Sequence, residues 1–176
     1  RGQAGTSVKL TVKRGNEVLT VNIVRAQIQV NPIEYKTLEK DLGYIRITEF
    51  NNNTYANVTT AIQDLKKQGI KKLILDLRGN PGGSLDQVLK VSNYFVPKGK
   101  LLEIQYKEAK PDVFYSTGNL QFEKVAVLID GNTASASEIL AGAIQDTNSG
   151  TLIGTTSYGK GVVQDLYPLK NGEAIK

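Results

Sequence analysis

The sequence contains no histidine and no cysteine, and these two absences remove most of the ways in which a protein activates a nucleophile. Without cysteine there is no thiol nucleophile, no disulfide framework and no cysteine-based zinc site. Without histidine a catalytic zinc site is not expected, and the base that activates a serine has to be lysine, aspartate, glutamate or a chain terminus. Lysine can act as that base only where burial or a neighbouring charge lowers its pKa and leaves the amine uncharged.

Aromatic residues, clustered positive charge and long apolar runs are also scarce. Aromatic residues make up 7% of the chain, and the net charge of +5 is scattered, without an arginine-rich stripe. A nucleic-acid-binding surface combines clustered basic charge with stacking aromatic side chains, so nucleic acid is not an expected partner. No run of about 18 apolar residues is present, which is the length that a membrane-spanning helix requires.

What is present is enough for one hydrophobic core, since the 176 residues are 40% hydrophobic. Near the N-terminus, apolar and polar residues alternate over 7–13 and 18–24 around a turn at 14–17, which predicts a hairpin. A hairpin is too small to be stable alone, so we expect the edge of a sub-domain or the remainder of a larger domain. The polar segment 27–42 contains Pro32 and is predicted to be a linker with some local helix.

From residue 43 onward the pattern alternates between strands and helices. Apolar runs predict strands at 43–50, 72–77, 101–106, 113–116, 125–129, 151–154 and 162–167. Helical spacing of apolar residues predicts helices at 55–65, 85–95 and 135–146. This alternation indicates an α/β fold whose strands are buried and largely parallel.

Two strand-to-helix junctions carry the residues that chemistry can use. The first, 76–83, contains the sequence NPGG, and the second, 130–136, contains Ser135. The carboxyl ends of parallel strands lie at one edge of a sheet, so these loops converge if their strands are neighbours. The backbone N–H groups of Gly83 and Ala136 can then bind a developing oxyanion. An ordinary turn explains NPGG equally well.

Ser135 has a structural explanation beside the catalytic one. The sequence from Ser135 to Glu138 fits the S-x-x-E capping box at the start of a helix. Capping is the commoner reason for a serine at such a position. The two interpretations of Ser135, helix cap and nucleophile, are therefore both carried forward.

Lys160 is the candidate base for Ser135. It lies between Gly159 and Gly161 and leads into an apolar segment, so it can point inward, although most lysines are solvated. Gln164 follows four residues later, and on a straight strand these four residues span about 13 Å. A contact between Lys160 and Gln164 therefore requires a turn or bulge near Gly161.

A second motif overlaps Lys160. Residues 154–160 match GxxxxGK, the beginning of a phosphate-binding P-loop. The next residue is Gly161, where the motif requires serine or threonine, and the following segment is predicted to be a strand although a P-loop leads into a helix. The P-loop is thus the weaker interpretation of this segment.

Four sequence segments occur in a fixed order: GYIRITEF, ILDLRGNPGGSLDQVLKVSNYF, VAVLIDGNTASASEILAGAIQD and GTTSYGKGVVQ. From about Pro32 to its end, the chain resembles the C-terminal processing proteases, also called tail-specific proteases. Residues 1–28 resemble the closing strands of the PDZ domain in that family. The resemblance divides the chain into the end of a PDZ domain, 1–28, and a peptidase core, 29–176.

The resemblance implies a crotonase-like α/β core and a serine endopeptidase that acts on C-terminal regions of proteins. Ser135 and Lys160 match the catalytic dyad, Gln164 matches a glutamine that orients the lysine, and Gly83 and Ala136 match the oxyanion amides. No metal or other cofactor is implied. The implied partners are protein or peptide substrates with accessible C-termini.

The resemblance also implies a location in the bacterial periplasm or cell envelope, often with a membrane anchor upstream, and access to the active site controlled by the PDZ domain. The carboxylate-binding loop of the PDZ domain, an N-terminal helical region and the last strands of the family pattern are not in the sequence. We therefore expect a fragment that can be inactive by itself. Two other classes stay open, namely a crotonase-type acyl-CoA enzyme and a non-catalytic scaffold that binds peptides.

Overall fold

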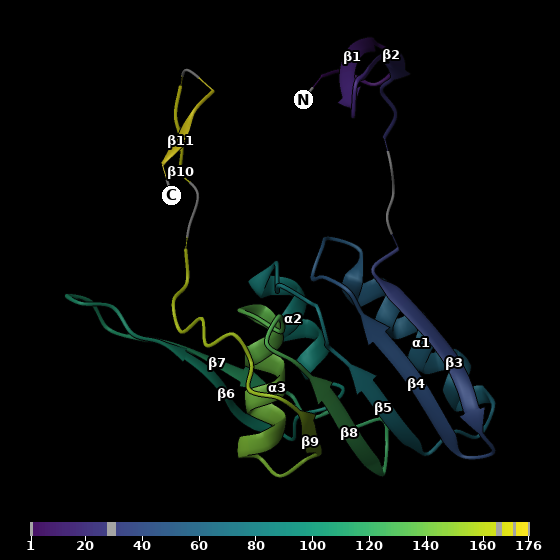
Figure 1. The fold of residues 1–176 in the computed structure, drawn as a ribbon. Helices are drawn as coiled ribbons and strands as arrows, with labels where there is room; N and C mark the ends of the chain where they lie inside the picture. The colour runs from purple at the N-terminus through teal and green to yellow at the C-terminus, as the bar shows by residue number, and fades with distance from the viewer. Residues whose placement is uncertain (1, 28–30, 165–166, 171, 176) are drawn as a thin grey trace. The chain divides into compact units, whose positions relative to one another are not determined.

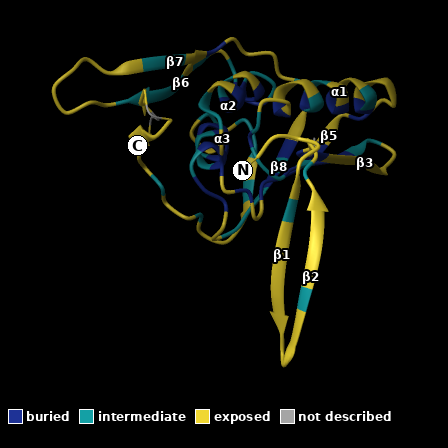
Figure 2. Cartoon of the chain, turned by 90° about the horizontal axis from the view of Figure 1, so that it is seen from above, coloured by how far each residue is buried: buried dark blue, intermediate teal, exposed yellow. Residues whose placement is uncertain are grey.

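A computed structural model of the chain describes residues 2–27, 31–164, 167–170 and 172–175. The chain forms two compact units, Arg1–Val30 and Asn31–Lys176. The first unit contains strands β1 (Ser7–Arg14) and β2 (Glu17–Val24), which pair antiparallel. Because Arg14 pairs with Glu17, the turn between them has two residues, and the predicted hairpin is confirmed. Both strands are largely exposed (Figure 2).

The second unit is built around a five-stranded sheet with the order β3-β4-β5-β8-β9 (Figure 1). Strand β3 is antiparallel to β4, whereas the other three pairings are parallel. The strands are β3 (Ile33–Glu39), β4 (Leu42–Ile47), β5 (Lys72–Asp76), β8 (Lys124–Ile129) and β9 (Thr151–Gly154). The prediction of an α/β fold with a largely parallel sheet is confirmed.

Three helices follow the strands, α1 (Thr54–Lys67), α2 (Leu85–Ser92) and α3 (Ala136–Asp146). Helix α1 packs on β3 and β4, α3 packs on β9, and α2 contacts both of the other helices. Each helix turns its apolar face inward, so that buried side chains such as Leu65 on α1 and Leu140 on α3 share one core with Leu75 on β5. Figure 2 shows the buried residues concentrated in this unit.

Two small antiparallel ribbons complete the second unit. Strands β6 (Gly99–Ile104) and β7 (Asp112–Ser116) pair with each other, as predicted, and contact α3 and α2 respectively. Strands β10 (Tyr167–Pro168) and β11 (Ala174–Ile175) form the second ribbon. Among the described residues, no helix combines the length and apolar character that crossing a membrane would require.

Two of the predicted segments differ from the structure. The predicted linker with local helix at 27–42 is wrong, because Ile33–Glu39 is strand β3; residues 28–30 lie outside the described part. This strand is at the sheet edge and six of its seven residues are exposed, so polar side chains suit it. The predicted strand at 162–167 is also wrong over 162–164, which pair with no strand, and 165–166 lie outside the described residues.

The strand order decides where the candidate site lies. Strands β5 and β8 are parallel neighbours, so the loops that follow them leave the sheet at the same edge. One loop leads from β5 to α2 and carries NPGG, and the other leads from β8 to α3 and carries Ser135. The predicted convergence of the two junctions is confirmed.

Candidate active site

Ser135 occupies a strained turn between β8 and α3. Its backbone angles are φ 56° and ψ −118°, in the half of conformational space that favours glycine. A non-glycine residue in such a conformation stores about 1–3 kcal/mol and persists only where its surroundings impose it. A sharp strand-to-helix turn of this kind exposes the nucleophilic serine in α/β-hydrolases. The backbone of Ser135 thus has the geometry that a nucleophile needs.

The loop after β5 is fixed by Asn80, whose side chain is fully buried. Its amide donates to the carbonyl of Ile47 at 2.9 Å and its side-chain oxygen accepts the Gly82 N–H at 2.9 Å. The carbonyl of Asn80 accepts the N–H of Ala134 at 3.0 Å, next to Ser135. One asparagine therefore holds the two loops in register.

The two glycines of NPGG are required by close backbone contacts. A Cβ atom on Gly82, whose φ is 101°, would lie 2.7 Å from the carbonyl oxygen of Ala134. Gly83 has a φ of 138°, and a Cβ atom there would overlap the carbonyl oxygen of Phe50. Only glycine fits both positions, so NPGG is more than an ordinary turn.

Asp130 and Thr133, in the loop after β8, also form hydrogen bonds with residues in the loop after β5. The Asp130 carboxylate accepts the N–H groups of Gly79 and Asn132, each at 3.0 Å. The hydroxyl of Thr133 donates to the carbonyl of Leu77 at 2.9 Å. The pKa of Asp130 is lowered, and the hydrogen bond from the Gly79 N–H is the largest cause. Asp130 therefore stays ionised at neutral pH and keeps both loops in place.

Gly83, Ala136 and Ser135 line one pocket of about 410 Å³ together with Lys160 and Gln164. Within the described part of the chain, no acceptor is hydrogen-bonded to the N–H of Gly83 or of Ala136. Ala136 is the first residue of α3, where backbone N–H groups have no partner within the helix. The pocket therefore offers two free amide donors beside a serine hydroxyl.

Lys160 reaches the site from the loop after β9. It is half-buried and lines, with Ser135, a second pocket of about 500 Å³ between strand β6 and Val162. Its Nζ donates to the Oε1 atom of Gln164 at 3.2 Å. The contact between Lys160 and Gln164, which a straight strand would not permit, is therefore formed. In the described part of the chain no direct hydrogen bond joins the Ser135 hydroxyl to this amine. Catalytic hydrogen bonds are often long before substrate binds.

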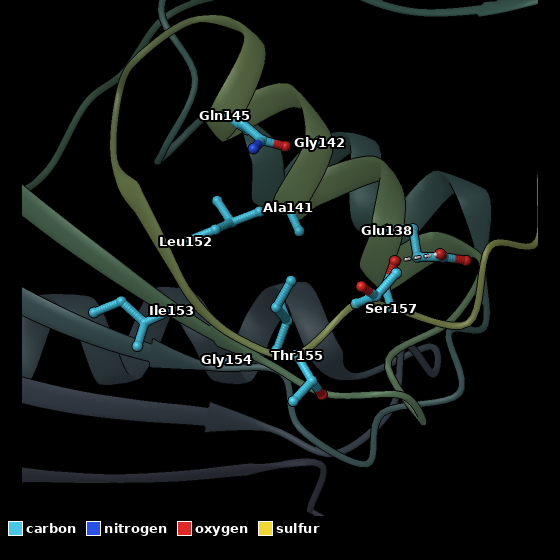
Figure 3. Close-up of a pocket in the computed structure, with 11 residues that line it drawn as sticks. Glu138, Ala141, Gly142, Gln145, Leu152, Ile153, Gly154, Thr155 and Ser157 are labelled. Atoms are coloured by element: carbon cyan, nitrogen blue, oxygen red, sulfur yellow. Dashed lines mark hydrogen bonds between the residues drawn. The ribbon is translucent and has the colours of Figure 1, made fainter.

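Glu138 connects the helix that follows Ser135 to the loop that carries Lys160. Its carboxylate accepts the Ser135 N–H at 2.7 Å, so the carboxylate half of the predicted capping box is formed. It also accepts a hydrogen bond from Ser157, drawn in Figure 3. Two further hydrogen bonds come from the N–H groups of Gly159 and Lys160. Burial alone raises the pKa of this carboxyl, but the four hydrogen bonds outweigh burial and the pKa is lowered. The capping and catalytic interpretations of Ser135 are therefore compatible.

At the carboxyl end of β5, the buried carboxylate of Asp76 pairs with the exposed guanidinium of Arg78. The Asp76 side chain is buried and accepts hydrogen bonds from the Tyr44 hydroxyl at 2.7 Å and the Arg78 guanidinium at 2.7 and 3.0 Å. Burial by itself raises the pKa of Asp76. The hydrogen bonds from Arg78 and Tyr44, together with the charge of Arg78, have a larger effect in the opposite direction, so the pKa of Asp76 is lowered.

Asp76→Asn is expected to lower the free energy of unfolding at pH 7 by about 2 kcal/mol, because charged hydrogen bonds are lost. The folded pKa lies below the unfolded value of about 3.9, so the stabilisation is complete well above that value and is lost as pH falls through the folded pKa. Urea unfolding at pH 7 and in steps below pH 4 should show the gap between the two proteins closing. A gap of constant size down to pH 2 would contradict the assignment. Asp41→Asn, at an exposed pair with Lys72, is the control and should change little.

The sequence predicted the residues that line the pocket, but not the residues whose hydrogen bonds hold the two loops together. Asn80, Asp130 and Thr133 were not singled out, and Glu138 was assigned only to the capping box. Asn80 and Asp130 each follow a buried strand closely, which is the available signal for a residue that fixes a loop. The P-loop alternative is not supported, because residues 161–164 form no helix.

Comparisons with known proteins define the class to which this fold and cleft belong. The family model described as Peptidase family S41 matches residues 41–176. The "Carboxy-terminal-processing protease" of Bartonella bacilliformis is 40% identical over 185 residues, covering 100% of this chain and 42% of the relative. The "Probable CtpA-like serine protease" of Staphylococcus aureus is 38% identical over 181 residues, covering 100% of this chain and 36% of the relative.

A solved structure, "Photosystem II D1 C-terminal processing protease", matches with a TM-score of 0.73 and 30% identity, covering 97% of this chain and 49% of that one. A structure named as a putative S41 protease from Bacteroides fragilis shares the fold, with a TM-score of 0.68, 21% identity, and coverage of 93% of this chain and 50% of that one. The matches are thus to serine peptidases. The chain belongs to peptidase family S41, the family of the C-terminal processing proteases. It spans 36–42% of the length of these curated relatives.

Proposed function

We propose that the protein is a serine endopeptidase that cleaves within the C-terminal regions of protein substrates, with Ser135 and Lys160 as its catalytic dyad. The observation that carries this proposal is one pocket that holds Ser135, Lys160 and the free N–H groups of Gly83 and Ala136. A hydroxyl, an amine and two convergent amide donors are the parts that acyl transfer needs. Membership of family S41 and the names of the relatives support the same reaction.

The reaction has two stages. Ser135 Oγ attacks the scissile carbonyl carbon while the uncharged amine of Lys160 takes the hydroxyl proton, and the carbonyl π electrons move to oxygen. The N–H groups of Gly83 and Ala136 stabilise this oxyanion. Collapse of the tetrahedral intermediate breaks the C–N bond, and Lys160 delivers the proton to the leaving amine. Water, deprotonated by Lys160, then attacks the acyl-enzyme, and its proton returns to Ser135 when the ester bond breaks.

Gln164 and the substrate prepare Lys160 for this role. The Gln164 side-chain oxygen holds the Lys160 Nζ at 3.2 Å and so limits where the amine can point. The Lys160 side chain is half-buried. A peptide that fills both pockets lined by Lys160 excludes water from around the amine.

The finer fold assignments belong to the same proposal. The α/β unit is the core of a crotonase-like peptidase, and the β1–β2 hairpin, with residues up to 28, closes a PDZ domain that controls access to the cleft. The partners are protein or peptide substrates with accessible C-termini, and the chemistry requires no metal or other cofactor. The location is the bacterial periplasm or cell envelope, with a membrane anchor elsewhere in the full-length protein.

Ser135→Ala tests the proposal. In the intact protein this change should lower kcat/KM on peptides with a free C-terminus by at least about 10⁴-fold, because no nucleophile remains. Ser137→Ala is the matched control, since its buried hydroxyl has no hydrogen-bond partner in the described structure and lies in the same sequence motif. Liquid chromatography of the cleavage products measures both variants, and thermal unfolding verifies that both are folded.

Cleavage at the wild-type rate by Ser135→Ala would refute the assignment. An intact wild-type protein that cleaves no peptide but binds an acyl-CoA in a calorimeter would instead favour the crotonase-type enzyme. Peptide binding without cleavage would favour the non-catalytic scaffold.

A further inference from the structure

The Glu138 carboxylate is a meeting point for four hydrogen-bond donors. Oε2 accepts the N–H of Ser135 at 2.7 Å and the N–H of Lys160 at 2.9 Å. Oε1 accepts the hydroxyl of Ser157 at 2.7 Å and the N–H of Gly159 at 2.6 Å. The backbones of both dyad residues are thus bound to the same oxygen atom.

The helix cap accounts for only one of these four bonds. A capping box needs the carboxylate to accept the N–H of the cap residue, here Ser135. The other three donors come from a loop 19 to 22 positions further along the chain. Figure 3 shows the Glu138 side chain directed from α3 toward Ser157 on that loop. Such convergence on one carboxylate points to a role in joining two segments.

The loop that carries Lys160 has few other attachments. Residues 156–164 form neither helix nor strand, and Tyr158 and Val162 are 70% and 62% exposed. Within the described residues, one further backbone bond holds it, from the Tyr158 N–H to the carbonyl of Thr133 at 2.9 Å. Glu138 therefore supplies most of the hydrogen bonds between this loop and the rest of the site.

We propose that Glu138 is a positioning residue that holds the Lys160 loop against the start of α3, so that the amine reaches the Ser135 hydroxyl. This inference rests on the dyad of the proposed function and extends it to a residue that touches neither substrate nor reacting atoms. Because a displacement of about 1 Å in a catalytic group can cost about 100-fold in rate, loss of the clamp acts on kcat. Glu138 lines neither of the two pockets that Ser135 shares with Lys160, so KM should change little.

Glu138→Gln is the informative variant. Glutamine keeps one accepting oxygen but presents an NH₂ group where the other oxygen was. With the NH₂ group at the Oε2 position, the N–H groups of Ser135 and Lys160 both lose their acceptor. With the NH₂ group at the Oε1 position, the N–H of Gly159 loses its acceptor, while the Ser157 hydroxyl can rotate and accept instead. Glu138→Ala removes all four bonds, so the effects should rank in the order wild type, glutamine, alanine.

Two measurements on the intact protein test the proposal, with Glu123→Gln as the matched control. Glu123 is an exposed carboxylate that pairs with Lys71 ahead of β8, at the end of the strand away from the cleft. In Glu138→Gln, hydrogen exchange at the amides of Gly159 and Lys160 should become at least about tenfold faster. Peptide cleavage should show kcat about 100-fold lower with KM within about twofold. Both quantities should be unchanged in Glu123→Gln.

The two readouts separate this proposal from the one on which it depends. Unchanged exchange at Gly159 and Lys160 overturns the clamp, whatever the activity. Faster exchange throughout α3 and the sheet also overturns it, because Glu138 then serves only general stability. Faster exchange confined to 157–164 with unchanged kcat shows that the clamp does not serve catalysis and overturns the positioning role. If the wild-type protein itself cleaves nothing, the dyad fails, and the positioning role fails with it, even where exchange shows that the clamp holds the loop.

Discussion

Replacement of Lys160 by alanine is expected to lower kcat/KM for peptide cleavage by about 10⁴-fold in the intact protein, with little effect on stability. The chain contains no histidine, and Lys160 is the basic side chain that lines both pockets with Ser135. Among the described residues, no other lysine or arginine lines these two pockets, so the amine that takes the serine proton is lost. The side chain is half-buried and, within the described part of the chain, makes one hydrogen bond, to Gln164, so its loss should change the unfolding free energy only slightly.

Lys160→Arg separates the base from the charge. Arginine keeps a positive charge at this position but is always protonated and cannot accept the proton. We therefore expect Lys160→Arg to be as inactive as Lys160→Ala. Lys67→Ala, at an exposed lysine on α1, is the control and should keep full activity. More than a tenth of wild-type activity in Lys160→Arg would show that lysine acts through its charge.

Gly83→Ala is expected to reduce both stability and turnover. An alanine at this position would have to keep the backbone φ of 138°, which residues other than glycine rarely adopt. Its methyl group would also overlap the Phe50 carbonyl oxygen, so the loop must shift. Backbone strain of this kind costs about 1–3 kcal/mol before the displacement is counted. The shift also moves the Gly83 N–H away from the oxyanion, and loss of one such donor lowers kcat by about 100-fold or more.

Gly142→Ala is the matched control for this variant. Gly142 lies in α3, and a Cβ atom there would meet nothing within 4 Å. Alanine in a helix is favoured over glycine by about 1 kcal/mol, so this variant should be as stable as wild type or more so, with unchanged kcat. Both variants should be assayed below their melting temperatures. Wild-type kcat in folded Gly83→Ala would exclude its N–H from the oxyanion site.

The sequence was sufficient to predict those helices and strands in which the spacing of apolar residues follows their burial. Strands β5 and β8 are short apolar runs in which buried residues alternate with partly buried ones over most of each strand. Strand β3 was missed because an exposed edge strand needs no apolar pattern, and its polar residues looked like a linker. The segment 162–164 is apolar for another reason, since Val162 and Val163 line the pockets beside Ser135 instead of pairing in a sheet.

The candidate site was predictable where a residue's chemistry or a family resemblance marks it. Ser135 and Lys160 stand out in a chain without histidine and cysteine. The two strand-to-helix junctions indicated the amide donors of Gly83 and Ala136, and the resemblance supplied the role of Gln164. The tying residues were not predictable in the same way. The bond from Gly79 to Asp130 spans 51 positions, and its existence depends on β5 and β8 being neighbours, which periodicity does not reveal.

The most direct test of the account measures how fast a fluorophosphonate probe reacts with the intact protein and with its Lys160→Ala variant at neutral pH. Mass spectrometry of the intact protein gives the rate, and peptide mapping gives the modified residue. The account predicts a single adduct on Ser135, formed about 10³-fold more slowly when Lys160 is absent. Equal rates in the two proteins, or an adduct on another residue, would show that Lys160 does not activate Ser135.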